Sequence, residues 1–306
     1  MNAWAVMFPG QGTQTVGMGR DWTEADPEAR RWFDRASEVL GWDLARVCFK
    51  GPEEVLTRSD HAQPAIFVVS VVAWEALQRV RPDRAWKASA GLSSGEWAAL
   101  YAAGVLTFED VVRVLQIRGR AMQEACERHP GAMLSVIGLD SSILQHICAR
   151  SGAEIANLNS PEQTVLSGPR EAIEAAERLA GEAGARRVIR LNVAGAFHSS
   201  LMKSAAEALQ QALASVAFRP PRWPVFSNVT GRPHGGPEEI RTAMVRQITA
   251  SVRWVDCVRG MQALGVDAVL ECGPGRVLTG LAKRIDKNLR TYNLAAFSDL
   301  KTVAEA

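Results

Sequence analysis

A serine lies at the centre of the segment Gly91-Leu92-Ser93-Ser94-Gly95, which matches the pattern G-x-S-x-G. Glycines on both sides allow the sharp strand-to-helix turn that pushes a serine hydroxyl outward. The start of the following helix places backbone N–H groups where an oxyanion could form. The spacing therefore predicts Ser93 as a nucleophile for acyl transfer, with Ser94 as the competing serine. A plain glycine-rich turn is the alternative interpretation.

A serine nucleophile needs a base, and the chain offers five histidines for that role. His198 lies in the sequence GAFHSS at residues 195–200, where the chain returns from a central block to a larger unit. Such junctions are common places for a ligand cleft. We therefore predict that His198 takes the proton of Ser93, and a structural histidine is the alternative.

A helix predicted from Thr107 carries one arginine among its apolar residues. The apolar stripe consists of Val111, Val114, Leu115, Met122 and Ala125. At about 100° per residue, Arg118 falls in the middle of this stripe, whereas Arg113 and Arg120 fall on the opposite face. A guanidinium on a buried face needs an anion or several hydrogen-bond acceptors. Two interpretations follow: a structural ion pair, or a two-point contact with a substrate carboxylate.

The elements that must position these residues alternate between strands and helices. Predicted strands at residues 4–8, 86–90 and 268–271 each end in a glycine-rich turn. Helices are predicted at residues 27–40 and 64–80. Strands that end in such turns before helices are typical of an α/β sheet whose site lies at the carboxyl ends of the strands. We therefore predict an α/β fold.

The middle of the chain has a different order of elements. Between residues 132 and 191 the pattern predicts strand, helix, strand, strand, helix and strand, which is the ferredoxin-like arrangement. A block of this kind within a larger βα pattern indicates an insertion. We predict an inserted subdomain at residues 128–196, between the two parts of the larger unit at residues 1–127 and 197–306.

Composition excludes several other classes of protein. The 306 residues are 47% hydrophobic and 22% charged with a net charge of +2, which excludes a disordered chain and gives no basis for nucleic-acid binding. The five cysteines are widely spaced without a C-x-x-C pair, which favours a reducing compartment over a disulfide framework or a zinc site. No basic leader and no apolar run of about 20 residues is present. We therefore expect a cytoplasmic protein that does not bind membranes.

Eight segments in one order along nearly the full chain resemble the malonyl-CoA:acyl carrier protein transacylase family and the related acyltransferases of polyketide synthases. The segments are residues 8–12, 91–96, 118–124, 159–163, 195–199, 227–231, 247–254 and 273–280. The resemblance implies an α/β-hydrolase-like core with a ferredoxin-like insert. It also implies that Ser93 is the nucleophile and His198 the base, oriented by a backbone carbonyl near Gln247, so no triad aspartate is expected.

The same resemblance assigns the groups around the dyad. It implies an oxyanion hole formed by the backbone N–H groups of Gln11 and Ser94, and it implies that Arg118 holds the free malonyl carboxylate. The sequence Ala-Phe-His ending at His198 is similar to that of family members that take unbranched malonyl groups. The chain departs from the usual G-H-S-L-G sequence, because Leu92 and Ser94 replace the histidine and the leucine.

The resemblance predicts transfer of a malonyl group from malonyl-CoA to the phosphopantetheine thiol of acyl carrier protein through a malonyl-serine, without a metal or nucleotide cofactor. We expect a monomer with a basic patch for the acidic carrier protein. Candidates for that patch are Arg186, Arg187, Arg190, Arg276, Lys283 and Arg284. The alternatives are a stand-alone polyketide synthase acyltransferase, an acyl hydrolase with the same dyad, and a non-catalytic module that binds carrier protein.

Overall fold

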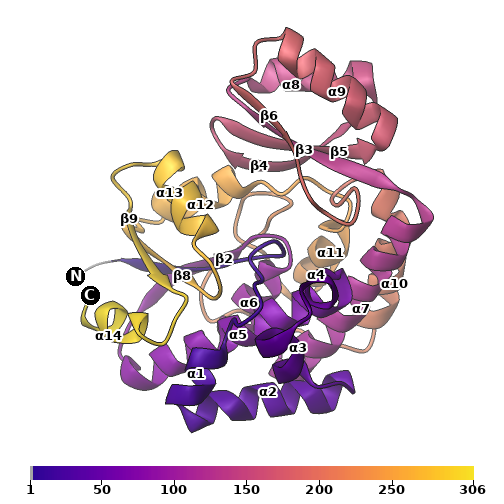
Figure 1. Cartoon of the computed structure of the whole chain (residues 1–306). Helices are drawn as coiled ribbons and strands as arrows, with labels where there is room; N and C mark the ends of the chain where they lie inside the picture. The colour runs from indigo at the N-terminus through magenta and orange to yellow at the C-terminus, as the bar shows by residue number, and fades with distance from the viewer. Residues whose placement is uncertain (1–2) are drawn as a thin grey trace.

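The computed structural model describes residues 3–306, which form two β-sheets of different kinds (Figure 1). One sheet is parallel throughout. In spatial order its strands are β7 (Val225–Phe226), β2 (Trp86–Gly91), β1 (Trp4–Phe8), β8 (Ala268–Cys272) and β9 (Arg290–Leu294). Because parallel strands need crossover connections, helices link them and cover both faces of the sheet.

Strand β1 illustrates how one segment serves both faces. Trp4, Val6 and Phe8 belong to one apolar cluster, whereas Ala5 and Met7 belong to another, as the alternation of side chains along a strand requires. The first cluster includes residues of helices α5 (Ser59–Val80) and α7 (Phe108–Arg128), and the second includes residues of helices α12 (Trp254–Ala263) and α13 (Val277–Ile285). The helices around this sheet are α1 (Arg20–Ala25), α2 (Pro27–Leu40), α3 (Leu44–Lys50), α4 (Glu53–Thr57), α5 (Ser59–Val80), α6 (Gly95–Ala102), α7 (Phe108–Arg128), η1 (Ser200–Met202), α10 (Lys203–Leu213), α11 (Pro237–Arg246), α12 (Trp254–Ala263), α13 (Val277–Ile285) and α14 (Asp299–Glu305).

The second sheet is antiparallel and has the strand order β4-β5-β3-β6. Its elements follow the predicted sequence of strand, helix, strand, strand, helix and strand. They are β3 (Gly131–Ile137), α8 (Ser141–Ser151), β4 (Glu154–Ser160), β5 (Gln163–Pro169), α9 (Arg170–Glu182) and β6 (Arg187–Arg190). Helices α8 and α9 cover the face that points away from the parallel sheet (Figure 1). On the opposite face, Met133 and Val165 join the core of the larger unit.

Helix α5 differs from its prediction. It begins at Ser59 rather than at residue 64, so Pro64 lies inside the helix. Proline favours the first turn of a helix, which made Pro64 the natural place to begin it. Although α5 has 22 residues and is mostly buried, none of the helices formed by residues 3–306 is long and apolar enough to cross a membrane.

Candidate active site

Three glycines allow the loops after β1 and β2 to meet at the carboxyl edge of the parallel sheet. Phe8 pairs with Gly91 at the ends of these strands, and the Leu92 N–H donates to the Phe8 carbonyl at 3.0 Å. A Cβ on Gly10 would lie 2.2 Å from the Leu92 oxygen, and one on Gly95 would lie 2.3 Å from the Phe8 oxygen. A Cβ on Gly91 would lie 2.0 Å from the Gly95 carbonyl carbon. The backbones therefore approach too closely for any larger residue.

Ser93 stands at the top of this turn in a strained conformation. Its φ of 53° lies in the left-handed region, which a residue other than glycine adopts only when its surroundings enforce it. Asn228, just after β7, supplies that enforcement: its Oδ1 accepts from the Ser93 N–H at 2.7 Å, and its Nδ2 donates to the Gly91 carbonyl at 2.8 Å. The turn is therefore more than a plain glycine-rich connection.

His198 lies against the Ser93 hydroxyl, as predicted. Its Nε2 is 2.7 Å from Ser93 Oγ, and its Nδ1 is 2.9 Å from the backbone carbonyl of Gln247. Because a carbonyl can only accept, Nδ1 carries the proton and Nε2 is free to accept one from the serine. Burial, assisted by the positive charge of Arg118, lowers the pKa of His198 to about 4, which keeps the imidazole neutral. No acidic side chain contacts His198 within residues 3–306.

Arg118 is buried beside the same serine and has only neutral oxygens as partners. It donates to Gln63 Oε1 at 2.6 Å, to Gln247 Oε1 at 3.1 Å and to Ser93 Oγ at 3.3 Å. Its Nε has no partner, and no ion pair of this arginine is found in the described part of the chain. Burial lowers its pKa to about 10, so it stays charged. The described residues therefore provide no structural ion pair for Arg118, and its guanidinium lies at the wall of a cavity beside Ser93.

The two residues whose backbone N–H groups are expected at the oxyanion hole contact each other. The Gln11 N–H donates to the Ser94 hydroxyl at 3.2 Å. The Ser94 N–H has no acceptor among residues 3–306. Gln11 is held in place by Ser59, whose hydroxyl accepts from Gln11 Nε2 at 3.0 Å. An oxyanion at this position would accept a hydrogen bond from the Gln11 N–H, either together with the Ser94 hydroxyl or in its place.

These groups open onto a cavity of about 410 Å³, a volume in the usual range for small-molecule sites. Gln11, Ser93, Arg118 and His198 all contribute to its wall, whereas the Gln247 carbonyl and the Ser94 hydroxyl support that wall. The remaining lining comes from loops and helices of the larger unit and from the antiparallel sheet, and it combines polar and apolar side chains. It includes Met122, Met133, Val165, Leu191, Val193, Phe197 and Val277. The cavity therefore lies between the larger unit and the antiparallel sheet.

Sequence reasoning did not single out two functional side chains of the site. Gln63 on α5 orients Arg118, and Asn228 holds the Ser93 backbone. Both are amides with no characteristic spacing from the residues that they contact, which lie 55 and 135 positions away along the chain. Only the folded structure brings them to the serine.

Comparisons with known proteins agree with this arrangement. The family described as "Acyl transferase domain" matches residues 6–296. A malonyl CoA-acyl carrier protein transacylase of Escherichia coli strain K12 is 41% identical over 313 residues, covering 100% of this chain and 99% of that protein. A crystal structure of a malonyl-CoA:acyl carrier protein transacylase from Xanthomonas oryzae has a TM-score of 0.95 at 38% identity, covering 100% and 98% of the two chains.

A further similar structure contains a partner. It is a malonyl-transacylase in complex with its type II polyketide synthase acyl carrier protein, with a TM-score of 0.96, 39% identity and coverage of 99% of both chains. The family match spans nearly the whole chain, and these relatives share its full length. With the serine, histidine and arginine in one cavity, they establish that this chain belongs to the acyl transferase domain family.

Proposed function

We propose that this chain transfers a malonyl group from malonyl-CoA to the phosphopantetheine thiol of acyl carrier protein through a malonyl-serine intermediate. The position of Arg118 carries the proposal. Its buried guanidinium lies 3.3 Å from Ser93 Oγ and has no carboxylate partner among residues 3–306. A malonyl group on that oxygen carries a carboxylate separated from the reacting carbonyl by one methylene group, within reach of the guanidinium. The name of the E. coli relative supports the same reaction.

In the first half-reaction, Ser93 Oγ attacks the thioester carbonyl of malonyl-CoA while His198 Nε2 accepts the serine proton. The carbonyl oxygen gains the negative charge and binds the N–H groups of Gln11 and Ser94. The carbon–sulfur bond then breaks, and CoA leaves with the proton from His198. Because the Gln247 carbonyl accepts from Nδ1 of this histidine, it stabilises the imidazolium that forms in between.

The second half-reaction reverses these steps with a different thiol. The phosphopantetheine thiol gives its proton to His198 and attacks the malonyl ester on Ser93. The ester bond breaks, the serine regains the proton, and the malonyl group leaves as a thioester of the carrier protein. Both halves use the same groups, so we propose no metal or nucleotide cofactor.

An acidic carrier protein would bind at the mouth of the cavity, where Val193 and Val277 are 37% and 49% exposed. Among the six basic candidates, Arg186 pairs with Glu162, Arg190 with Glu177 and Arg276 with Asp299, while Arg284 donates to Gln163. Arg187 and Lys283 make no ion pair within residues 3–306. These two charges are therefore the ones most available to a partner.

We further propose an α/β-hydrolase-like core at residues 1–127 and 197–306 with a ferredoxin-like insert at residues 128–196. The separate parallel and antiparallel sheets support this division. Residues 1 and 2 lie outside the described residues. A monomer in the cytoplasm is the state that we propose for the protein.

The proposed intermediate can be tested directly by intact-protein mass spectrometry. Incubation with malonyl-CoA should add one malonyl group to the protein, located on Ser93 by peptide mapping. Ser93→Ala should abolish the addition, whereas Ser94→Ala should keep it. A label on Ser94 or on a cysteine would contradict the assignment of the nucleophile.

The acceptor is tested by adding carrier protein to the malonylated enzyme. The label should move to the phosphopantetheine thiol in preference to water. Release of malonate at the same rate with and without carrier protein would favour the hydrolase. A panel of carrier proteins from fatty acid and type II polyketide systems would identify the acceptor, since the complex described above joins such a polyketide carrier protein to its transacylase.

A further inference from the structure

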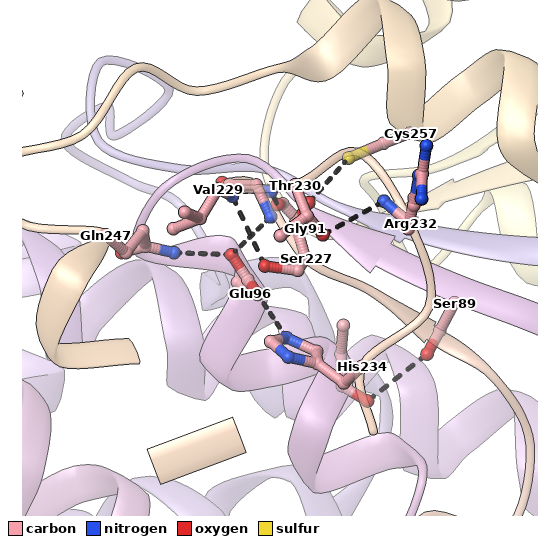
Figure 2. Close-up of polar contacts among 12 residues, drawn as sticks. Ser89, Gly91, Glu96, Ser227, Val229, Thr230, Arg232, His234, Gln247 and Cys257 are labelled. Carbon is pink, nitrogen blue, oxygen red and sulfur yellow. Dashed lines mark hydrogen bonds and ion pairs between the residues drawn. The ribbon is translucent and has the colours of Figure 1, made fainter. Parts of the chain in front are cut away.

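A buried carboxylate lies directly behind the candidate site. Glu96 is the second residue of α6 and is 1% exposed. Its Oε1 is 2.6 Å from Nε2 of His234, and its Oε2 accepts from Nε2 of Gln247 at 2.6 Å and from the backbone N–H of Asn228 at 3.1 Å. Figure 2 shows the carboxylate between Gln247 and His234. Its partners come from two segments of the chain, residues 228–234 after β7 and Gln247 after α11.

Gln247 connects Glu96 to three groups of the site. Its backbone carbonyl accepts from His198 Nδ1 at 2.9 Å, and its Oε1 accepts from Arg118 at 3.1 Å. Its Nε2 also donates to the Ser93 carbonyl at 3.0 Å. One glutamine therefore contacts the proposed base, the proposed carboxylate-binding arginine and the backbone of the proposed nucleophile.

Asn228 connects the same carboxylate to the serine turn. The Glu96 carboxylate accepts a hydrogen bond from the backbone N–H of Asn228. The Asn228 side chain accepts from the Ser93 N–H at 2.7 Å and donates to the Gly91 carbonyl at 2.8 Å. The strained φ of Ser93 depends on these contacts. Glu96 is thus one residue removed from every group that the proposed reaction uses, apart from the oxyanion hole.

The charge of Glu96 determines how the Gln247 amide is oriented. A carboxylate only accepts hydrogen bonds and a guanidinium only donates them. The NH₂ of Gln247 must therefore face Glu96, and its carbonyl must face Arg118. A neutral group in place of Glu96 could donate as well as accept, so it would no longer dictate which end of the Gln247 amide faces Arg118. The negative charge of Glu96 also raises the pKa of Arg118, which opposes the effect of burial on that guanidinium.

His234 completes the environment of the carboxylate. Its side chain is 2% exposed, and its backbone N–H donates to the Val225 carbonyl at 2.8 Å, which attaches it to β7. With His234 on Oε1 and two donors on Oε2, both oxygens of Glu96 have partners. A carboxylate buried in this way is rigid, which suits a group that holds others in place.

We propose that Glu96 is a positioning residue for acyl transfer, acting through Gln247 and Asn228 on His198, Arg118 and Ser93. It does not touch the substrate. Its effect is to hold the Gln247 carbonyl and amide and the Asn228 backbone at the distances that the dyad and the arginine require. This inference rests on the malonyl transfer proposed above.

The test measures steady-state malonyl transfer by Glu96→Gln, with Glu75→Gln as the matched control. Glu75 lies on α5, and its carboxylate accepts a hydrogen bond from the Tyr101 hydroxyl at 2.8 Å. Replacing it therefore perturbs a carboxylate outside the site. Glu96→Gln should lower kcat about 10²-fold with a smaller change in KM, since a displacement of about 1 Å costs that much. Glu75→Gln should keep kcat. A folded Glu96→Gln enzyme with normal kcat would overturn the inference.

A double-mutant cycle separates positioning from a general loss of stability. If Glu96 acts through Gln247, the double variant Glu96→Gln/Gln247→Ala should lose little more activity than the more impaired single variant. Independent effects would multiply and contradict the proposal.

A second variant serves if Glu96→Gln fails to fold. Glu96→Asp keeps the charge but withdraws it by one methylene group, so its kcat should also fall; a normal kcat would overturn the inference. Wild-type enzyme that is not malonylated would contradict the proposed function itself, whereas normal wild-type loading with unimpaired Glu96 variants would contradict only the positioning role.

Discussion

Two arginines, Arg84 and Arg118, are buried in different regions of the molecule, and their partners differ. Arg84 donates to the Val303 carbonyl at 2.8 Å, and its guanidinium lies 4.4 Å from the centre of the Trp4 ring. It therefore joins helix α14 to strand β1. Arg118 contacts side-chain oxygens at the wall of a cavity and faces the Ser93 hydroxyl.

The difference teaches that burial of a charge does not by itself indicate a functional site. Burial lowers the pKa of both arginines. The partners of Arg84 are two backbone carbonyls, those of Val303 and Ala304, and an aromatic ring, all of which have fixed positions, so this arginine contributes to the fold. The partners of Arg118 are neutral, and the space beside them is open. Replacements in the two regions should therefore have opposite consequences for rate and stability.

The largest expected effect is on the rate, at His198. His198→Ala should slow both half-reactions about 10²–10⁴-fold, the usual contribution of a general acid–base group. The melting temperature should change little, because the imidazole serves the reaction. Single-turnover loading and discharge of the malonyl group measure the rate, and thermal unfolding measures stability. A collapsed melting transition would place His198 with the structural residues.

Arg84→Ala should give the reverse result. Losing its hydrogen bonds and its ring contact should lower the free energy of unfolding by about 1–3 kcal/mol. The kcat for malonyl transfer should stay near that of the wild type, because Arg84 lies outside the cavity. Denaturant titration and steady-state kinetics make the two measurements. A large fall in kcat without loss of stability would break the comparison between the two arginines.

The smallest effect concerns pH. Because the pKa of His198 is lowered to about 4, kcat/KM should stay level down to about pH 5 and fall near pH 4. Arg118→Ala removes a positive charge that lowers the pKa of His198. The fall in kcat/KM at acidic pH, measured for this variant with acetyl-CoA, should therefore occur at a higher pH than in the wild type. An unchanged pH profile would contradict an electrostatic effect of Arg118 on His198.

Stability should follow the same titration. The pKa of His198 in the folded protein lies below its ordinary value of 6.5, so the unfolded chain binds more protons between about pH 6.5 and pH 4. This contribution to the free energy of unfolding is therefore present above about pH 6.5 and is lost as the pH falls toward 4. Urea titrations across that range, compared between wild type and His198→Ala, measure it.

Much of the fold could be predicted because its signals are local. Strand β1 and helix α2 have the predicted bounds, since an apolar run before a glycine-rich turn and an amphipathic period each lie within one segment. The buried face of α7 placed Arg118 correctly for the same reason. Strand β9 was not predicted: it is an edge strand with partly exposed residues, and only its pairing with β8 defines it.

In the candidate site too, the features that could be predicted are local in sequence and the others depend on contacts between distant residues. Gly91 and Gly95, like Ser93 and His198, lie within short sequence motifs. The contacts of Glu96 with Gln247 and Asn228 join residues 151 and 132 positions apart, and nothing in their local sequence indicates the pairing. The hydrogen bond from Gln11 to Ser94 is likewise a product of two loops that meet only in the folded sheet.

The central claim is that Arg118 selects a carboxylate-bearing acyl group, and the ratio of kcat/KM for malonyl-CoA to that for acetyl-CoA tests it most directly. Arg118→Ala should lower this ratio about 10²-fold or more, because each charge-assisted hydrogen bond is worth about 1.5–3 kcal/mol. Arg118→Lys should restore little, since a point charge cannot reproduce the planar fork. Arg120→Ala, on the exposed face of the same helix, should leave the ratio unchanged. An unchanged ratio in Arg118→Ala, with only a loss of stability, would contradict the account.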